Sequence, residues 1–197
     1  MPITRLVCPL NPSRDHLQRL VELQTLFAEA CTWLARTVRE TRCWNRVALH
    51  HLAYRQLREK YPQLGSQMAC NVIYAVCRSA RQVYQGENSP WKVDKDGAAP
   101  LPLLCFAPTA PVYFDQRTLS VRKGSLSLFT LDGRMQFEIK LGAAQARLFE
   151  SSAPKEVVLQ RGREGFSLTF FFEKPERQEQ QSAALPDYLQ VQSVAAS

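Results

Sequence analysis

The chain begins with a short strand pattern that its neighbours in the sequence cannot complete. Positions 3–8 (Ile-Thr-Arg-Leu-Val-Cys) are apolar-rich and partly β-branched, and the run stops at Pro9, as is typical of a β-strand. A lone strand is not stable in water, because it needs a partner for its backbone hydrogen bonds. A helical pattern follows at once, so the partner must lie far along the chain. We therefore expect this strand to join strands of the C-terminal half.

The region after the strand has the apolar spacing of helices. One apolar stripe recurs at intervals of three, four or seven, with Ser13 as its expected N-cap, and its members are Leu17, Leu20, Phe27, Cys31, Leu34 and Val38. Positions 44–45 interrupt it. A second helix is expected to end before Tyr61-Pro62, since a residue preceding proline is disfavoured in helical conformation. A third is expected from Gly65, with Ser66 as its cap and one apolar face formed by Met68, Val72, Val76, Ser79 and Val83.

The apolar period falls to two in the C-terminal half. Alternating runs at 126–130 and 135–139 flank Asp132-Gly133, a dipeptide that strongly favours a β-hairpin. Further strands are expected at 118–121, 156–160 and 166–173, the last two joined by a turn with Gly162 and Gly165. The segment between the helices and these strands is proline-rich with little periodicity, and the end of the chain is rich in Gln, Glu, Ser and Ala, which favours a mobile tail.

These patterns predict an α+β protein: a small antiparallel β-barrel that carries an inserted domain of three helices. The expected organisation is residues 1–12 for the first barrel strand, 13–88 for the helical insert, 89–111 for an irregular linker, 112–174 for the rest of the barrel and 175–197 for a flexible tail.

The charge balance favours a nucleic-acid partner. Lys and Arg number 25 against 18 Asp and Glu, giving a net charge of +7, and 18 of the 25 are Arg. Arginine grips phosphates bidentately and stacks on bases, so an arginine-weighted excess fits nucleic acid. A basic surface without a partner is the alternative. No signal peptide or membrane span is expected, which favours a cytoplasmic protein.

The six cysteines are not arranged as a zinc or redox motif. No C-x-x-C pair occurs, and Cys31 and Cys77 lie on apolar helical stripes, so all six are interpreted as reduced and mostly structural. The histidines lack a metal-protease spacing, and no glycine-rich phosphate loop or nucleophile elbow is present. The sequence therefore predicts no catalytic site, no metal and no cofactor. An enzyme with an unrecognised site is the least favoured class.

Basic side chains at helical spacing are the best binding signal. Interleaved with aromatic residues, they suit a surface that tracks a nucleic-acid backbone and stacks bases. A solvated face with intramolecular ion pairs to residues such as Glu40 and Glu59 is the alternative, and Trp33 and Tyr74 are interpreted as core residues. The candidate arginines are Arg36, Arg39, Arg42 and Arg46 close to one face near the end of the first helix, Arg55 and Arg58 with His51 on the second helix, and Arg78 and Arg81 on the third.

The chain resembles the N-terminal half of TnpB, the transposon-encoded relative of type V CRISPR effectors. The resemblance rests on the ordered series 49–62 (LHHLAYRQLREKYP), 64–69 (LGSQMA), 115–120 (DQRTLS), 126–134 (LSLFTLDGR) and the aromatic strand before 173–175 (EKP), with 10–13 (LNPS) similar to the usual start. It covers about residues 3 to 175. The barrel would then correspond to the family's wedge domain, of OB type, and the helical insert to its recognition domain.

The resemblance implies RNA-guided recognition of DNA. In such systems the guide reads sequence by base pairing, while the protein reads the heteroduplex shape and a short adjacent DNA motif. It adds candidate contacts at His50, His51, Tyr54, Ser66, Gln67 and Asn71 near the adjacent motif and at Gln116, Arg117, Arg122 and Lys123. For Ser66 and Asn71 we keep the alternatives of an N-cap and an interhelical hydrogen bond.

The family's RuvC-like nuclease and its zinc ribbon have no counterpart in the sequence. We therefore expect a module that binds guide RNA and target double-stranded DNA without cutting, together with a RuvC-bearing chain or a full-length relative. It could be a natural subunit, a degenerate transposon remnant or a fragment. The alternative from another class is a transcription regulator that binds duplex DNA without RNA.

Overall fold

The computed structural model describes residues 5–93, 97, 99–173 and 184–193. The fold is α+β, and within these residues it has four α-helices, one 3-10 turn and antiparallel strands. In chain order the elements are β1 (Arg5–Pro9), α1 (Arg14–Thr41), α2 (Arg46–Lys60), the turn η1 (Pro62–Leu64), α3 (Gly65–Gln85), β2 (Leu103–Phe106), β3 (Val112–Phe114), β4 (Leu119–Arg122), β5 (Ser125–Thr130), β6 (Gly133–Glu138), α4 (Ala143–Ser151), β7 (Glu156–Gly162), β8 (Gly165–Phe171) and β9 (Leu189–Gln192).

The chain forms two compact units, which are described one at a time. The strand unit comprises Met1–Thr25 and Pro111–Lys174, and the helical unit comprises Leu26–Ala110 and Pro175–Ser197. The first turns of α1 therefore belong to the strand unit and the remainder to the helical unit. This division differs from the predicted one, which placed all of 13–88 in a helical insert and treated 89–111 and 175–197 as a linker and a tail.

The first sheet of the strand unit has the order β1-β8-β7-β3. β1 pairs antiparallel with β8, with Leu6 opposite Phe170 and Cys8 opposite Leu168. Both pairs are buried. The prediction that the first strand joins strands of the C-terminal half is therefore confirmed, although positions 3–4 of the predicted strand lie outside the described residues.

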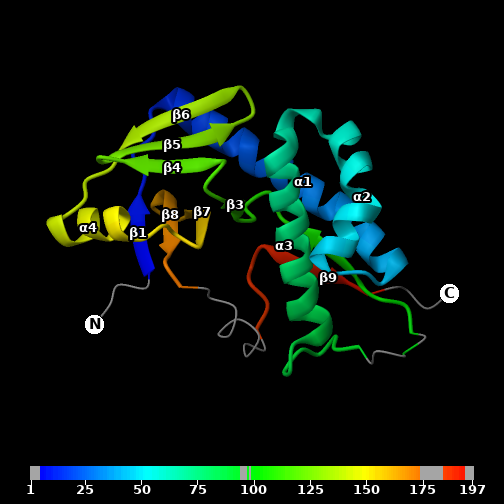
Figure 1. Cartoon of the computed structure of the whole chain (residues 1–197). Coiled ribbons are helices and arrows are strands. Elements are labelled where there is room, and N and C mark those ends of the chain that lie inside the picture. The colour runs from blue at the N-terminus through cyan, green and yellow to red at the C-terminus, as the bar shows by residue number, and fades with distance from the viewer. Residues whose placement is uncertain (1–4, 94–96, 98, 174–183, 194–197) are drawn as a thin grey trace. The chain divides into compact units, whose positions relative to one another are not determined.

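The second sheet of the strand unit is the meander β4-β5-β6 (Figure 1). Its hairpin turns at Asp132-Gly133 as predicted, and Gly133 has φ 120°, a conformation that disfavours residues with a side chain. The first turns of α1 pack on its apolar face, where the His16 ring meets the Phe137 ring edge-on at 5.2 Å. The Arg19 guanidinium donates to Asp132 at 2.8 Å and to the Thr130 hydroxyl at 2.9 Å.

Within the described residues neither sheet closes into a barrel. β1 and β3 are the two edges of the first sheet, and β3 has only three residues. It is bounded by Pro111, which has no N–H to donate, and by the turn at 115–118 that the Asp115 carboxylate closes onto the N–H of Arg117 and Thr118. So short an edge strand leaves the first sheet and the meander with separate ladders.

The helices α1, α2 and α3 agree with the predicted pattern, with one correction at a cap. The Ser13 hydroxyl accepts from the His16 N–H at 3.2 Å, as expected of an N-cap. Ser66, by contrast, lies inside α3, because the 3-10 turn η1 leads directly into the helix. The N-cap is Leu64, whose side chain has no acceptor for a capping bond. The predicted apolar face of α3 is buried.

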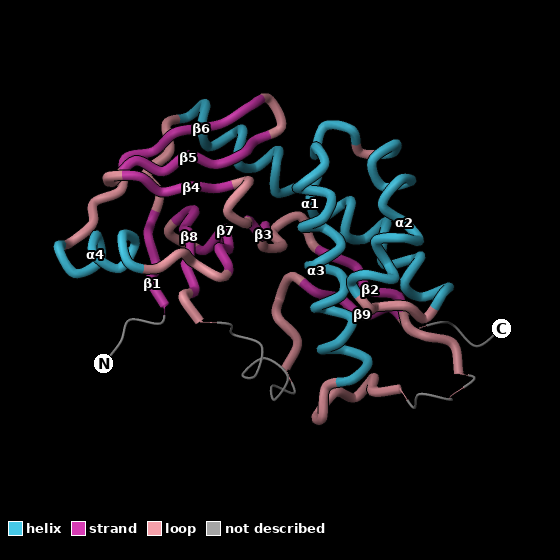
Figure 2. Tube along the Cα trace, in the orientation of Figure 1, coloured by secondary structure: helices cyan, strands magenta, loops and turns pink. Residues whose placement is uncertain are grey.

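The sequence prediction missed β2, β3, β9 and the helix α4. β2 forms within the supposed irregular linker, and it pairs with β9 from the supposed flexible tail, as Figure 2 shows. Residues 175–183 and 194–197 of that tail lie outside the described residues. The strand β3 is a three-residue run before the first predicted strand of the meander. The helix α4 begins after Gly142, whose N–H donates to Gln145 Oε1 at 2.9 Å, and its Phe149 ring lies 5.1 Å from that of Phe170.

No disulfide bond joins the six cysteines, all of which lie in the described residues. Cys31 and Cys77 are buried on the helical stripes, as predicted. Burial raises the pKa of the Cys77 thiol to about 12. Both therefore act as small apolar core residues. Among the helices of the described residues, none is long and apolar enough to cross a membrane.

Candidate nucleic-acid interface

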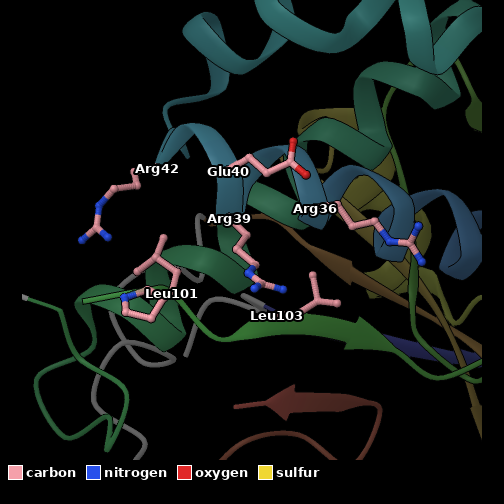
Figure 3. Close-up of a pocket in the computed structure, with 7 residues that line it drawn as sticks. Arg36, Arg39, Glu40, Arg42, Leu101 and Leu103 are labelled. Carbon is pink, nitrogen blue, oxygen red and sulfur yellow. The ribbon is translucent and has the colours of Figure 1, made fainter. Parts of the chain in front are cut away.

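A groove of about 580 Å³ lies beside the C-terminal turns of α1, and we call it the basic groove. One side is formed by α1 and the other by the chain that leads into β2, and its lining comprises Arg36, Arg39, Glu40, Arg42, Pro100, Leu101 and Leu103. Figure 3 shows Arg39 extending from α1 toward Leu101 and Leu103, with Arg36 and Arg42 on either side of it. Three of the predicted arginines therefore follow one another along this groove.

The apolar side of the basic groove is fixed by hydrogen bonds from the helices. The Tyr84 hydroxyl of α3 donates to the Pro102 carbonyl at 2.6 Å, and the Thr32 hydroxyl of α1 accepts from the Phe106 N–H at 2.8 Å. The Arg42 guanidinium donates to the Ala99 carbonyl at 2.8 Å. These bonds, together with the pairing of β2 with β9, hold an otherwise irregular segment in one position.

The helix α1 ends within the arginine row, just before Arg42. Arg42 follows the last helical residue and has φ 52°, the left-handed conformation that commonly ends helices. The chain then reverses, and the Asn45 side chain accepts from the N–H groups of Val47 and Ala48 to cap α2.

The electrostatics of the basic groove are strongly positive. Within the described residues Arg36 and Arg39 form no ion pair, and Glu40 is the sole carboxylate among the lining residues. In Figure 3 the Glu40 carboxylate points away from Leu101 and Leu103. Burial raises the pKa of Tyr84 to about 12, and the charge of Arg39 acts in the opposite direction. The tyrosine that supports the groove thus stays a hydrogen-bond donor at neutral pH.

Arg46 does not continue the row of the first helix, which corrects the predicted four-arginine stripe. It begins α2, where its guanidinium lies 5.3 Å from the centre of the Tyr74 ring. Arg78 lies 5.9 Å from the same ring and donates to the Tyr74 hydroxyl at 3.0 Å, while Arg81 donates to the Cys77 carbonyl. We call Arg46, Tyr74 and Arg78 the tyrosine cluster. Tyr74 is half-buried between two cations rather than a core residue.

The candidates on α2 make several contacts within the helix. His50 stacks on Tyr54 with ring centres 4.4 Å apart, and His51 is exposed. Arg55 pairs with Glu59 at 3.1 Å, and Arg58 donates to the Pro62 carbonyl at 3.4 Å. For Arg55 the intramolecular ion pair that we considered as the alternative is therefore present. Both partners are highly exposed, so the pair is weak and can exchange for another anion.

The candidates at the start of α3 divide into surface and core positions. Ser66 is exposed and Gln67 half-buried, so both have access to the surface. Asn71 is only 4% exposed, and its amide contacts the Met68 sulfur at 3.6 Å. This excludes Asn71 from direct contact with a base, because a bidentate pairing needs both amide atoms on the surface. Its burial fits a structural role, but the contact with Met68 lies within α3 and is not the interhelical hydrogen bond of the alternative.

The remaining candidates, Gln116, Arg117, Arg122 and Lys123, are exposed in the strand unit, at the turn before β4 and at the turn after it. Sequence reasoning missed Arg134, whose guanidinium lies on the same meander, since it belongs to no helical stripe. It also missed Leu101 and Leu103 of the basic groove. Their only sequence signal was a short apolar run among prolines.

Within the described residues, no group of three or more His, Cys, Asp or Glu side chains could hold a metal ion.

No protein-family model matches the sequence, and no curated protein matches it either.

Proposed function

We propose that the chain binds nucleic acid as the recognition part of an RNA-guided system of the TnpB and type V CRISPR effector kind. In this proposal the helical unit contacts guide RNA and the target duplex, and the sheets of the strand unit take the place of the family's wedge domain. Cleavage would be supplied by a RuvC-bearing partner chain. The observation that carries the nucleic-acid assignment is the basic groove, with Arg36 and Arg39 unpaired by any carboxylate in the described residues.

The chemistry of the basic groove suits a phosphate backbone. Residues three apart on a helix lie about 5–6 Å apart at their Cβ atoms, so Arg36 and Arg39 can contact neighbouring phosphates of one strand. Leu103, which is half-buried, faces them across the groove and offers apolar contact for sugars, whereas Leu101 is only 1% exposed and supports the groove from within. A small-molecule anion would use the arginines but leave the apolar side without a role.

The test is RNA binding by the full chain across a salt series, with the variant Arg36→Gln/Arg39→Gln. Losing two phosphate contacts should reduce the slope of log affinity against log salt by about 1.4 for a single strand or 1.8 for a duplex. The matched control is Arg161→Gln/Arg163→Gln, which removes the same charge from exposed positions at the β7–β8 turn. A control with the same slope change would show a general charge effect and refute the groove assignment.

RNA dependence separates this proposal from its alternative. The protein purified from its native host should carry RNA, and its binding to duplex DNA should be lost after ribonuclease treatment. Duplex binding that survives the treatment unchanged would instead favour a transcription regulator that binds DNA directly.

A further inference from the structure

The solvent-facing side of the β4–β6 meander combines one aromatic residue with charged and small polar residues. The strand register places three rows across it. Phe129 lies opposite Arg134 in one row, and the next row consists of Ser120, Ser127 and Gln136. Phe129 and Ser127 are half-buried and Arg134 is exposed. An accessible aromatic ring thus lies beside a guanidinium and a strip of small hydroxyl side chains.

Arg134 is held in place by the sheet itself. Its Nε donates to the Ser127 hydroxyl at 2.9 Å, its Nη2 to the Ser127 carbonyl at 3.2 Å, and its Nη1 to the Arg117 carbonyl at 3.2 Å. The side chain therefore crosses β5 toward the entrance of β4. Within the described residues it forms no ion pair. Its charge is fixed before any ligand binds, and little side-chain entropy is lost on binding.

The rim of this face is also cationic. Arg122 and Lys123 are exposed at the β4–β5 turn, and Arg117 is exposed before β4. Glu138, opposite Ser125 in the third row, is the carboxylate within the rows, while Asp132 of the β5–β6 turn is paired with Arg19. Positive charge therefore exceeds negative charge on this side of the sheet.

We infer that this face is a second, single-strand-specific RNA site, on which a base stacks on Phe129 and the phosphates contact the cations of the rim. Successive rows lie about 7 Å apart along a strand, a spacing that suits unstacked nucleotides. Serine and Gln136 side chains offer hydrogen bonds to exposed base edges, whereas a duplex would keep its bases hidden. The inference rests on the proposed RNA-binding function and adds the form of RNA that is bound.

The experiment uses the full chain with Arg36→Gln/Arg39→Gln, so that binding through the basic groove is already weakened. The probe is a labelled eight-nucleotide polyuridine that carries one 4-thiouridine, with an RNA duplex of equal length for comparison. Phe129→Leu should weaken single-strand binding about five- to 150-fold, the range for loss of one stacked base. Phe129→Tyr, which keeps the ring, should retain it. Arg134→Gln is a second variant that should weaken single-strand binding, and it keeps the test open if Phe129→Leu fails to fold. Its matched charge control is Arg147→Gln on α4, which should leave this binding unchanged.

Cross-linking locates the site independently of the affinities. Trypsin releases residues 124–134 as one peptide containing Phe129, and that peptide should carry the 4-thiouridine cross-link. Cross-links confined to the helical unit, with unchanged affinity in Phe129→Leu, would overturn this inference and leave the basic groove intact. Absence of RNA binding by the unmodified chain would overturn both. A preference for the duplex over the single strand would also refute the site.

Discussion

Leu189→Ala tests whether the C-terminal strand β9 is an integral part of the helical unit. Leu189 is 4% exposed and lies opposite Phe106 of β2, and the Ala107 N–H donates to the neighbouring Tyr188 carbonyl at 2.8 Å. Removing a buried leucine side chain generally costs 2–5 kcal/mol, and a position on a two-stranded sheet can relax more than the centre of a core. We therefore expect the free energy of unfolding to fall by about 2–3 kcal/mol.

Tryptophan fluorescence, excited selectively, reports on this unit alone. The three tryptophans are Trp33, Trp44 and Trp91, and all belong to the helical unit. Trp44 lies 5.3 Å from the Tyr84 ring, so its emission should change when that packing is lost. With an ordinary urea dependence for a unit of this size, the expected loss lowers the unfolding midpoint by about 1–2 M.

Gln190→Ala is the matched control, because it lies on the same strand and is exposed. Its free energy of unfolding should change by no more than about 0.5 kcal/mol, as is usual for surface positions, so its urea midpoint should stay close to that of the parent. If Leu189→Ala and Gln190→Ala had the same small effect, β9 would contribute nothing to the helical unit. The packing argument would then be wrong.

Two further predictions concern the caps and the strand unit. Ser13→Ala should lower the free energy of unfolding by about 1 kcal/mol, because it removes the N-cap of α1. Ser66→Ala should change the free energy of unfolding by less than about 0.5 kcal/mol, because Ser66 caps no helix. Circular dichroism during urea unfolding measures both changes. The pKa of Asp132 is lowered, first by the hydrogen bond from Thr130 and then by Arg19. A carboxyl whose folded pKa is depressed stabilises the fold above its ordinary pKa and loses that contribution as the pH falls toward the folded value. Asp132→Asn should therefore be less stable than the parent at pH 7, and the difference should vanish in acid; a constant difference would contradict the assignment.

Local patterns predicted the elements whose partners are local. The helical stripes and the Asp132-Gly133 hairpin depend on spacings of two to four residues, which a sequence displays directly. The pairing of β1 with β8 was also predictable, because a lone strand requires a partner and the C-terminal half supplied several. The predicted closure into a barrel is not seen in the described residues. Closure depends on pairing between edge strands, and the length of those strands and the turns beside them cannot be read from the local pattern.

The elements that were missed depend on contacts between distant segments. β2 is a four-residue apolar run among prolines, and it becomes a strand because β9 pairs with it 80 or more positions later. Arg46 was assigned to the wrong helix because a left-handed residue, Arg42, ends α1 before the arginine spacing ends. Neither event leaves a periodic signal.

The basic groove combines both kinds of information, and this has a consequence for its specificity. Its cations follow helical spacing and were predicted, but its apolar side is assembled by Tyr84, Thr32 and Arg42 acting on the backbone of 99–106. Cations alone would attract any polyanion, since their interaction with phosphates carries no shape information. A fixed apolar side opposite the arginines limits the ligand to one whose sugars can face Leu103 while its phosphates contact α1. Discrimination among polyanions at this groove should therefore depend more on the β2 segment than on the number of arginines.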